Sequence, residues 1–264
     1  MESVEGAQSF LKSGDAYDAF IGRYSGPLAV AFADAAGVAA GSLSLDVGCG
    51  PGALTRELVK RLGSGAVSAF DPSAPFVADC VARCPGVDVR LGRAEAIPFD
   101  DASFDRALAQ LVLHFVTDPL HAAREMRRVL RPDGIVAACV WDFAEGMEML
   151  RYFWDSAISV VPDAPDEART MRFGRKGEIA ELFDAAGFET IVETKLDVTC
   201  TYAGFDGLWS GFLAGSGPAG SFCVALPDKQ RGAIRDELFL RLGSPEGPFS
   251  LSAMARCACG RAPG

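Results

Sequence analysis

Histidine, long apolar runs and basic charge are all scarce in this chain of 264 residues. The only histidines are His114 and His121, and the longest mostly apolar stretch, residues 28–40, is interrupted by Asp34. A stretch of that length is too short to span a bilayer as a helix. Residues 1–10 are acidic and have no apolar core, which predicts no signal peptide. We therefore expect a soluble, cytoplasmic protein with no membrane partner.

The shortage of basic residues bears on the partners that the surface can attract. The chain has 25 lysines and arginines against 35 aspartates and glutamates, which gives a net charge of −10. A negative surface repels nucleic-acid phosphates, so we expect no nucleic-acid partner. Arg124, Arg127 and Arg128 lie close together, but such a group is more often a solvated helix face than a binding patch. We expect a monomer or a homodimer.

Cysteine, in contrast, is well represented, with eight residues scattered along the chain. Because no export signal is predicted, free and mostly buried thiols are favoured over disulfides. The pairs Cys80–Cys84 and Cys257–Cys259 are not matched by a second pair at a zinc-site spacing, and only two histidines could join them. We therefore expect no metal site.

The first 140 residues alternate short apolar runs with helical patterns, which is typical of a parallel sheet. Strands are expected at residues 43–47, 66–70, 87–91, 104–110 and 135–140. Helices are expected at residues 17–37, 53–62 and 73–82, and from Pro119 to a turn at residues 131–134.

The rest of the chain continues the sheet with interruptions. Helical insertions are expected at residues 143–174 and 204–243, and a helix over residues 178–186 is closed by Gly187. The last strands are expected at residues 188–199 and 249–259, with residues 260–264 frayed. The predicted fold is α/β, a doubly wound, mostly parallel, seven-stranded Rossmann-like sheet with helical insertions.

We divide this fold into three parts. Residues 1–41 form an N-terminal helical segment or lid, and residues 42–142 form the ligand-binding core. Residues 143–264 are the C-terminal part of the same domain, whose helical insertions we expect to form a pocket for a second ligand.

The most informative stretch, LSLDVGCGPG at residues 43–52, ends a strand and opens a helix. Such a loop lies at the carboxyl edge of an open α/β sheet, where ligands bind. Its three glycines allow the backbone to approach a ligand closely. The spacing Gly48-x-Gly50-x-x-Ala53 also fits the dinucleotide fingerprint, so an NAD(P)-dependent oxidoreductase is the main alternative. A tight turn without a ligand is a further one.

Two residues of this loop favour a cationic ligand. Asp46 would repel a pyrophosphate but attract the ammonium or sulfonium group of S-adenosylmethionine (SAM). Pro51 removes one backbone N–H from a loop that would need donors for phosphate. Asp71, directly after the next strand, can accept hydrogen bonds from the ribose hydroxyls of either cofactor. Alternatively, Asp71 is only the first residue of an Asp-Pro turn.

Four segments in order resemble the class I SAM-dependent methyltransferases. They are LDVGCGPG (45–52), FDPS (70–73), the stretch at 92–119 beginning GRAEAIPFDD, and MRRVLRPDGIVAACVWD (126–142). The branch that they resemble most includes the ubiquinone and menaquinone biosynthesis methyltransferases. The resemblance covers residues 42–142 and weakens through residues 143–264, where substrate-binding parts usually vary.

The resemblance implies SAM as cofactor and a role for each matched position. The methionine part would lie against Asp46, Gly48, Cys49, Gly50, Gln110 and Leu111, and the adenosine against Asp71, Pro72, Ser73, Ala94 and Glu95. This chain departs from the family at Arg93, where an Asp or Asn often meets the adenine amino group. Arginine cannot accept that hydrogen bond. Residues 17–24 also resemble a helix that closes over the cofactor in such enzymes, although they fit an ordinary amphipathic helix as well.

The implied reaction is in-line displacement at the sulfonium methyl by a small-molecule acceptor with an O, C or N nucleophile, giving S-adenosylhomocysteine (SAH). A general base is needed only if the acceptor loses a proton. The candidates for catalytic residues are His114, Tyr17 and Trp141, each with a simple packing role as the alternative. Further candidates are three aromatic residues for the wall of the acceptor pocket, Tyr24, Tyr152 and Trp154, and one strand-end residue, Asp142. His121 is a weaker candidate for the base.

Three other functions remain open at this stage. They are an NAD(P)-dependent oxidoreductase, a non-catalytic SAM-binding protein, and a SAM enzyme that does not transfer methyl. The chain reads Ala-Gln-Leu-Val at residues 109–112, and the absence there of an Asn-Pro-Pro-Tyr-like element argues against methylation of a nucleic-acid base.

Overall fold

The computed structural model describes residues 18–264 and contains one seven-stranded sheet with the order β3-β2-β1-β4-β5-β7-β6. The strands are β1 Ser44–Val47, β2 Val67–Asp71, β3 Asp88–Leu91, β4 Phe104–Gln110, β5 Leu130–Trp141, β6 Glu189–Tyr202 and β7 Phe249–Arg261. The first five strands are parallel, and β7 runs antiparallel to both β5 and β6. The predicted doubly wound, mostly parallel, seven-stranded fold is confirmed.

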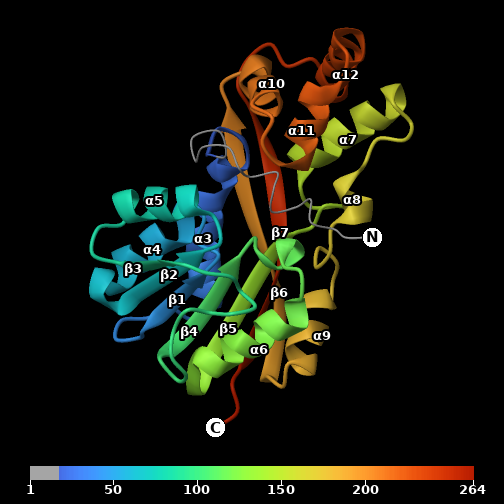
Figure 1. Cartoon of the computed structure of the whole chain (residues 1–264). Coiled ribbons are helices and arrows are strands. Elements are labelled where there is room, and N and C mark those ends of the chain that lie inside the picture. The colour runs from blue at the N-terminus through green and yellow to red at the C-terminus, as the bar shows by residue number, and fades with distance from the viewer. Residues whose placement is uncertain (1–17) are drawn as a thin grey trace.

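Helices cover both faces of the sheet (Figure 1). The order begins with a π-helical turn η1 Asp18–Gly22, then α3 Arg23–Ala35, α4 Ala53–Leu62, α5 Ala74–Arg83 and α6 Pro119–Val129. After β5 come α7 Glu148–Val160, α8 Glu167–Thr170, α9 Glu178–Ala185, α10 Phe205–Leu213, α11 Gly217–Ala225 and α12 Asp228–Arg241. Helices α3 and α4 contact each other, as do α6 and α9. None of the helices in residues 18–264 is long and apolar enough to cross a membrane.

Residues recognised in the sequence as helix boundaries lie at the ends of two of these helices. Asp118 caps α6 by accepting a hydrogen bond of 3.0 Å from the His121 backbone N–H, and Pro119 occupies the first helical position. Helix α9 ends at Ala185, and Gly187, two residues further on, has a φ of 82°, the left-handed conformation that glycine adopts readily. Both helix boundaries therefore agree with the sequence prediction to within a residue or two.

The two predicted insertions come together in space. Figure 1 shows β6 and β7 rising beyond the parallel strands and carrying α10, α11 and α12 at the top of the molecule. Helix α7, from the first insertion, contacts α11 and α12 from the second. The N-terminal segment joins them, because the Phe20 ring lies 5.0 Å from the Phe212 ring in an edge-on contact. The insertions therefore form one helical layer above the sheet edge.

Two local predictions were wrong. Strand β5 begins at Leu130 and not at residue 135, although residues 131–134 have no partner in the β4 register and Asp133 has a φ of 63°, so a turn-like irregularity does interrupt the strand there. The expected fraying after residue 259 does not occur, because Gly260 and Arg261 pair with Val136 and Ile135 of β5. Gly260 and Arg261 were interpreted locally, whereas their pairing with β5 decides their conformation.

Candidate cofactor and acceptor site

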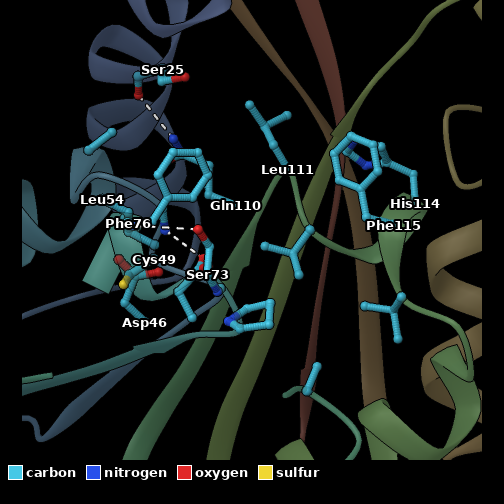
Figure 2. A pocket seen from close by; sticks show the side chains of 18 of the residues that line it. Ser25, Asp46, Cys49, Leu54, Ser73, Phe76, Gln110, Leu111, His114 and Phe115 are labelled. Atoms are coloured by element: carbon cyan, nitrogen blue, oxygen red, sulfur yellow. Dashed lines mark hydrogen bonds between the residues drawn. The ribbon is translucent and has the colours of Figure 1, made fainter. Parts of the chain in front are cut away.

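One cavity opens at the carboxyl ends of β1, β2, β4 and β5, next to the switch point between β1 and β4. The eleven residues expected to bind the cofactor all line it: Asp46, Gly48, Cys49, Gly50, Asp71, Pro72, Ser73, Ala94, Glu95, Gln110 and Leu111. Two of the three catalytic candidates, His114 and Trp141, line it as well, whereas Tyr17 lies outside the described residues. Figure 2 shows the cavity extending from Asp46 and Ser73 at one end to His114 and Phe115 at the other.

The glycine-rich loop needs its glycines for two different reasons. Gly48, Gly50 and Gly52 have φ values of 70°, 52° and 92°, in the left-handed region. A Cβ on Gly48 would lie 2.7 Å from a methyl carbon of Val112, whereas a Cβ on Gly50 would meet nothing within 4 Å. Gly50 therefore borders open space, and its backbone is the part of the loop that a ligand can approach closely.

Asp46 is a buried carboxyl group beneath this loop. Its side chain is 1% exposed and accepts a 2.6 Å hydrogen bond from Thr55 Oγ1. Burial raises the pKa of Asp46 to about 8, although the bond from Thr55 opposes the shift. A carboxylate that is costly to ionise alone becomes easier to ionise beside a cation. The site is therefore electrostatically suited to a positively charged group.

Asp71 holds the loop as well as lining the cavity. Its Oδ2 accepts a 2.9 Å hydrogen bond from the Gly50 N–H, and its Oδ1 accepts a 2.8 Å bond from the Ser73 N–H. Burial raises the pKa of Asp71 while these two bonds lower it. Each carboxylate oxygen has a second lone pair. Asp71 can therefore hold the loop and accept ribose hydroxyls at the same time.

The side expected to face adenine is organised by Glu95. Its Oε1 accepts hydrogen bonds of 3.0 Å and 3.3 Å from the N–H groups of Thr117 and Asp118. Arg93 lies 3.6 Å from Oε2, with its side chain 65% exposed. Glu95 therefore anchors the segment that starts α6, and the nearby arginine faces largely towards solvent.

Gln110 and Leu111 end β4 in an unusual conformation. Gln110 Nε2 donates a 3.0 Å bond to the Ser25 carbonyl of α3, drawn in Figure 2. Its Oε1 is buried with no partner in the part of the chain that the structure describes. Leu111 has a φ of 61°, which is strained for a branched side chain. Both features mark this strand end as a place built for a ligand rather than for stability alone.

The other end of the cavity is mostly apolar. We call it the acceptor end and define it by Ile21, His114, Phe115, Trp141, Phe143, Glu167 and Pro218, which all line the cavity. The His114 ring lies 3.9 Å from the Phe115 ring and 5.6 Å from the Phe143 ring. Burial and the positive charge of Arg172 lower the pKa of His114 to about 3. A histidine this weakly basic is neutral at pH 7 and suits hydrogen bonding better than proton abstraction.

Several candidates from the sequence lie elsewhere. Tyr24 and Trp154 are buried in the core, where Tyr24 hydrogen-bonds Tyr202 and Trp154 hydrogen-bonds Glu167. Tyr152 packs against the core from α7, and His121 lies in the first turn of α6. Asp142 forms a buried ion pair of 2.7 Å with Arg256, which agrees with the strand-end alternative rather than a pocket role. None of these five lines the cavity.

Sequence reasoning missed the carboxylate of Glu167. This residue starts the short helix α8, is 2% exposed and lines the cavity. In the sequence it stands in the polar stretch PDAPDEAR (162–169), which resembles an ordinary surface loop. Only the fold shows that α7 and α8 bury it. The phenylalanines at positions 115 and 143 were also missed, because isolated aromatic residues carry no positional signal.

The fold and this crevice define a doubly wound α/β protein of the kind that holds a nucleotide-like ligand at the sheet edge. The comparisons agree with this class. The family model described as methyltransferase domain matches residues 45–138. The malonyl-[acyl-carrier protein] O-methyltransferase of Halorhodospira halophila is 30% identical over 164 residues, covering 60% of this chain and 52% of that protein.

A second relative and a solved structure extend the similarity. The demethylmenaquinone methyltransferase of Lactobacillus johnsonii is 26% identical over 181 residues, covering 61% of this chain and 73% of that protein. The crystal structure of the candidate methyltransferase BH2331 from Bacillus halodurans matches with a TM-score of 0.59 at 16% identity, covering 89% of this chain and 99% of that one. Residues 45–138 thus match the methyltransferase domain family, and the chain shares its fold with BH2331.

The similarity to sequence relatives is partial. The chain spans about a third to a half of the length of the first curated relatives that it matches. The matched region is the cofactor half of the fold, and the residues after 138 lie outside the family model. Nothing in these comparisons supports the NAD(P)-dependent alternative.

Proposed function

We propose that this protein transfers a methyl group from SAM to a small-molecule acceptor and releases SAH. The observation that carries this proposal is Asp46, a buried carboxylate directly beneath a loop of three left-handed glycines. Such a site attracts the ammonium and sulfonium charges of SAM and repels a diphosphate. When bound, SAM supplies an activated methyl group on a cationic sulfur.

Different residues around the cavity would bind different parts of SAM. Asp46, the backbone of residues 48–50 and the free Oε1 of Gln110 would hold the methionine part. Asp71 would accept the ribose hydroxyls, and Pro72, Ser73, Ala94 and Glu95 would border the adenosine. Because Glu95 is already bonded to two backbone N–H groups, we expect it to shape the adenine pocket rather than to bind adenine alone.

The N-terminal segment would act as a lid over this site. Ile21 and Ser25 line the cavity, and Phe20 packs on α10. A segment that contacts both the cofactor half and the helical layer is well placed to exclude water from methyl transfer. If residues 1–41 are a lid, SAH should slow proteolytic cleavage within them. Equal cleavage with and without SAH would contradict this role.

Isothermal titration calorimetry with SAM, SAH and NAD tests the main proposal. We expect micromolar or tighter binding of SAM and SAH and none of NAD, and SAH should accumulate with a suitable acceptor. Tight NAD binding without SAM binding would overturn the proposal. SAM binding with no SAH formation across a broad acceptor panel would favour a non-catalytic role.

A further inference from the structure

The acceptor end of the cavity contains one carboxylate among otherwise apolar and aromatic side chains. Of the described residues that define this end, only Glu167 carries an acidic group. Glu167 begins helix α8, which lies beside α7 and away from α5 (Figure 1). It is therefore placed to face the second substrate.

The hydrogen bonds of Glu167 fix one oxygen and leave the other available. Trp154 Nε1 donates a 2.8 Å bond to Oε2. The structure gives Oε1 no donor from residues 18–264. Buried carboxylate oxygens normally have partners. Glu167 is 2% exposed overall and lines the cavity, so its second oxygen can accept a hydrogen bond from a ligand group there.

The charged neighbours of Glu167 do not neutralise it. Arg151, on α7, donates to both oxygens of Asp166 at 3.1 Å and 2.9 Å, so its charge is largely engaged by that residue. Burial disfavours the charged form of Glu167 most strongly, and the negative charge of Asp166 disfavours it further. Together they raise the pKa of Glu167 to about 7, against the opposing effects of Trp154 and Arg151. Near neutral pH the group is therefore poised to accept a proton.

This inference rests on the proposed function. We propose that Glu167 is the general base of the reaction and that the acceptor is an apolar or aromatic molecule with a protic nucleophile, an amine or a hydroxyl. The acceptor nitrogen or oxygen forms a bond to the methyl carbon. The bond from that carbon to sulfur breaks with its electron pair on the sulfur, which yields SAH. The acceptor proton moves to Glu167 Oε1, and product release returns it to solvent.

This assignment separates acceptor classes. A carboxylate acceptor carries no proton to remove at pH 7 and would be repelled by an ionised Glu167. The other basic group at this end, His114, is a much weaker base, because burial and Arg172 lower its pKa. The aromatic rings of Phe115, Trp141 and Phe143 would contact the apolar part of the acceptor.

The test compares three probes built on one aromatic ring, benzylamine, 4-methylphenol and phenylacetate, with wild type and E167Q. Glutamine keeps an oxygen to accept from Trp154, so the fold should persist. The matched control is E181Q, an exposed position on α9. We measure SAM affinity, SAH formation from each probe and, with SAH bound, the affinity for each probe by calorimetry.

We expect the amine or the phenol to be methylated, or bound in preference to phenylacetate if turnover is slow. E167Q should lower that turnover by about 10²–10⁴-fold, or remove that preference, with SAM affinity unchanged within about twofold. E181Q should match wild type. Turnover or binding that E167Q leaves unchanged, a preference for phenylacetate, or no preference at all would overturn the assignment. If the wild-type protein did not bind SAM at all, the proposed function itself would be refuted.

Discussion

Thr55 Oγ1 donates a hydrogen bond of 2.6 Å to Asp46 Oδ2, and both side chains are buried beneath the glycine-rich loop. Among residues 18–264, Thr55 is the only residue that hydrogen-bonds the Asp46 side chain. The fold thus keeps a poorly compensated carboxylate where a cation is expected. Such an arrangement costs stability in the free protein and contributes affinity in the complex.

The first prediction follows from these opposite effects of Asp46 on stability and on SAM affinity. Asp46→Asn should raise the melting temperature of the ligand-free protein at pH 8.5, because asparagine keeps an acceptor for Thr55 without a charge. The same change should weaken SAM binding by about 1.5–3 kcal/mol, the loss expected for a charged hydrogen bond. Thermal melts and calorimetry on one preparation check both effects. A variant that is less stable and binds SAM normally would show that Asp46 is only structural.

The second prediction concerns pH. The folded-state pKa of Asp46 is about 8, above its ordinary value of 3.8, so the folded protein binds more protons than the unfolded chain between these values. This group's contribution to stability is therefore fully present below about pH 4 and is lost as pH rises through 8. SAM favours the ionised form, so its affinity should increase from pH 5.5 to 7.5, by at most tenfold per unit. Asp46→Asn should flatten that slope.

The third prediction separates two glycines of the same loop. Gly50→Ala should cost about 1–2 kcal/mol of stability, since its φ of 52° is left-handed, and should weaken SAM binding because the methyl group enters the cavity. Gly52→Ala should cost about 2–4 kcal/mol, because its Cβ would also lie 3.1 Å and 3.3 Å from the sulfurs of Cys80 and Cys84. Urea denaturation measures the difference, and equal losses would contradict it.

The fourth prediction concerns Asp71. Asp71→Ala should weaken SAM binding by about 1–3 kcal/mol and also lower the melting temperature, because the N–H groups of Gly50 and Ser73 lose their acceptor. Asp79→Ala, on α5 outside the cavity, is the control. If Asp71→Ala left the SAM dissociation constant unchanged, the ribose assignment would be wrong.

The fifth prediction tests the proton acceptor at the other end of the cavity. Trp154→Phe removes the donor that favours the ionised form of Glu167, so the pKa of Glu167 should rise. The rate of methyl transfer to a protic acceptor should then increase at a higher pH than in wild type, with SAM affinity unchanged. A slower enzyme with an unshifted pH profile would show that Trp154 acts only through packing.

The cofactor half of the molecule was predictable because its signals are local. The glycine loop, the helix at residues 53–62 and the strand at residues 104–110 each follow from a short stretch of sequence, and the structure has the same bounds for the helix and that strand. The eleven expected cofactor residues meet in one cavity because parallel strands all end at one edge. Their individual roles in binding SAM stay predictions.

The acceptor half was not predictable in the same way. Glu167 reaches the cavity only because α7 buries it through Trp154, a contact between residues that share no sequence pattern. Similarly, Gly260 and Arg261 resemble a frayed chain end, yet they pair with β5. Long-range packing and sheet pairing decide such positions, and a single sequence does not encode them in any short segment.

The sheet order also constrains how the protein can be made. Strand β7 lies between β5 and β6 although it follows both in the chain. While the ribosome is still synthesising residues 249–261, β5 exposes an unpaired edge and β6 has no neighbour to bond. The cofactor half can assemble early, but the edge of its sheet at β5 stays open to pairing with other strands until β7 is inserted there.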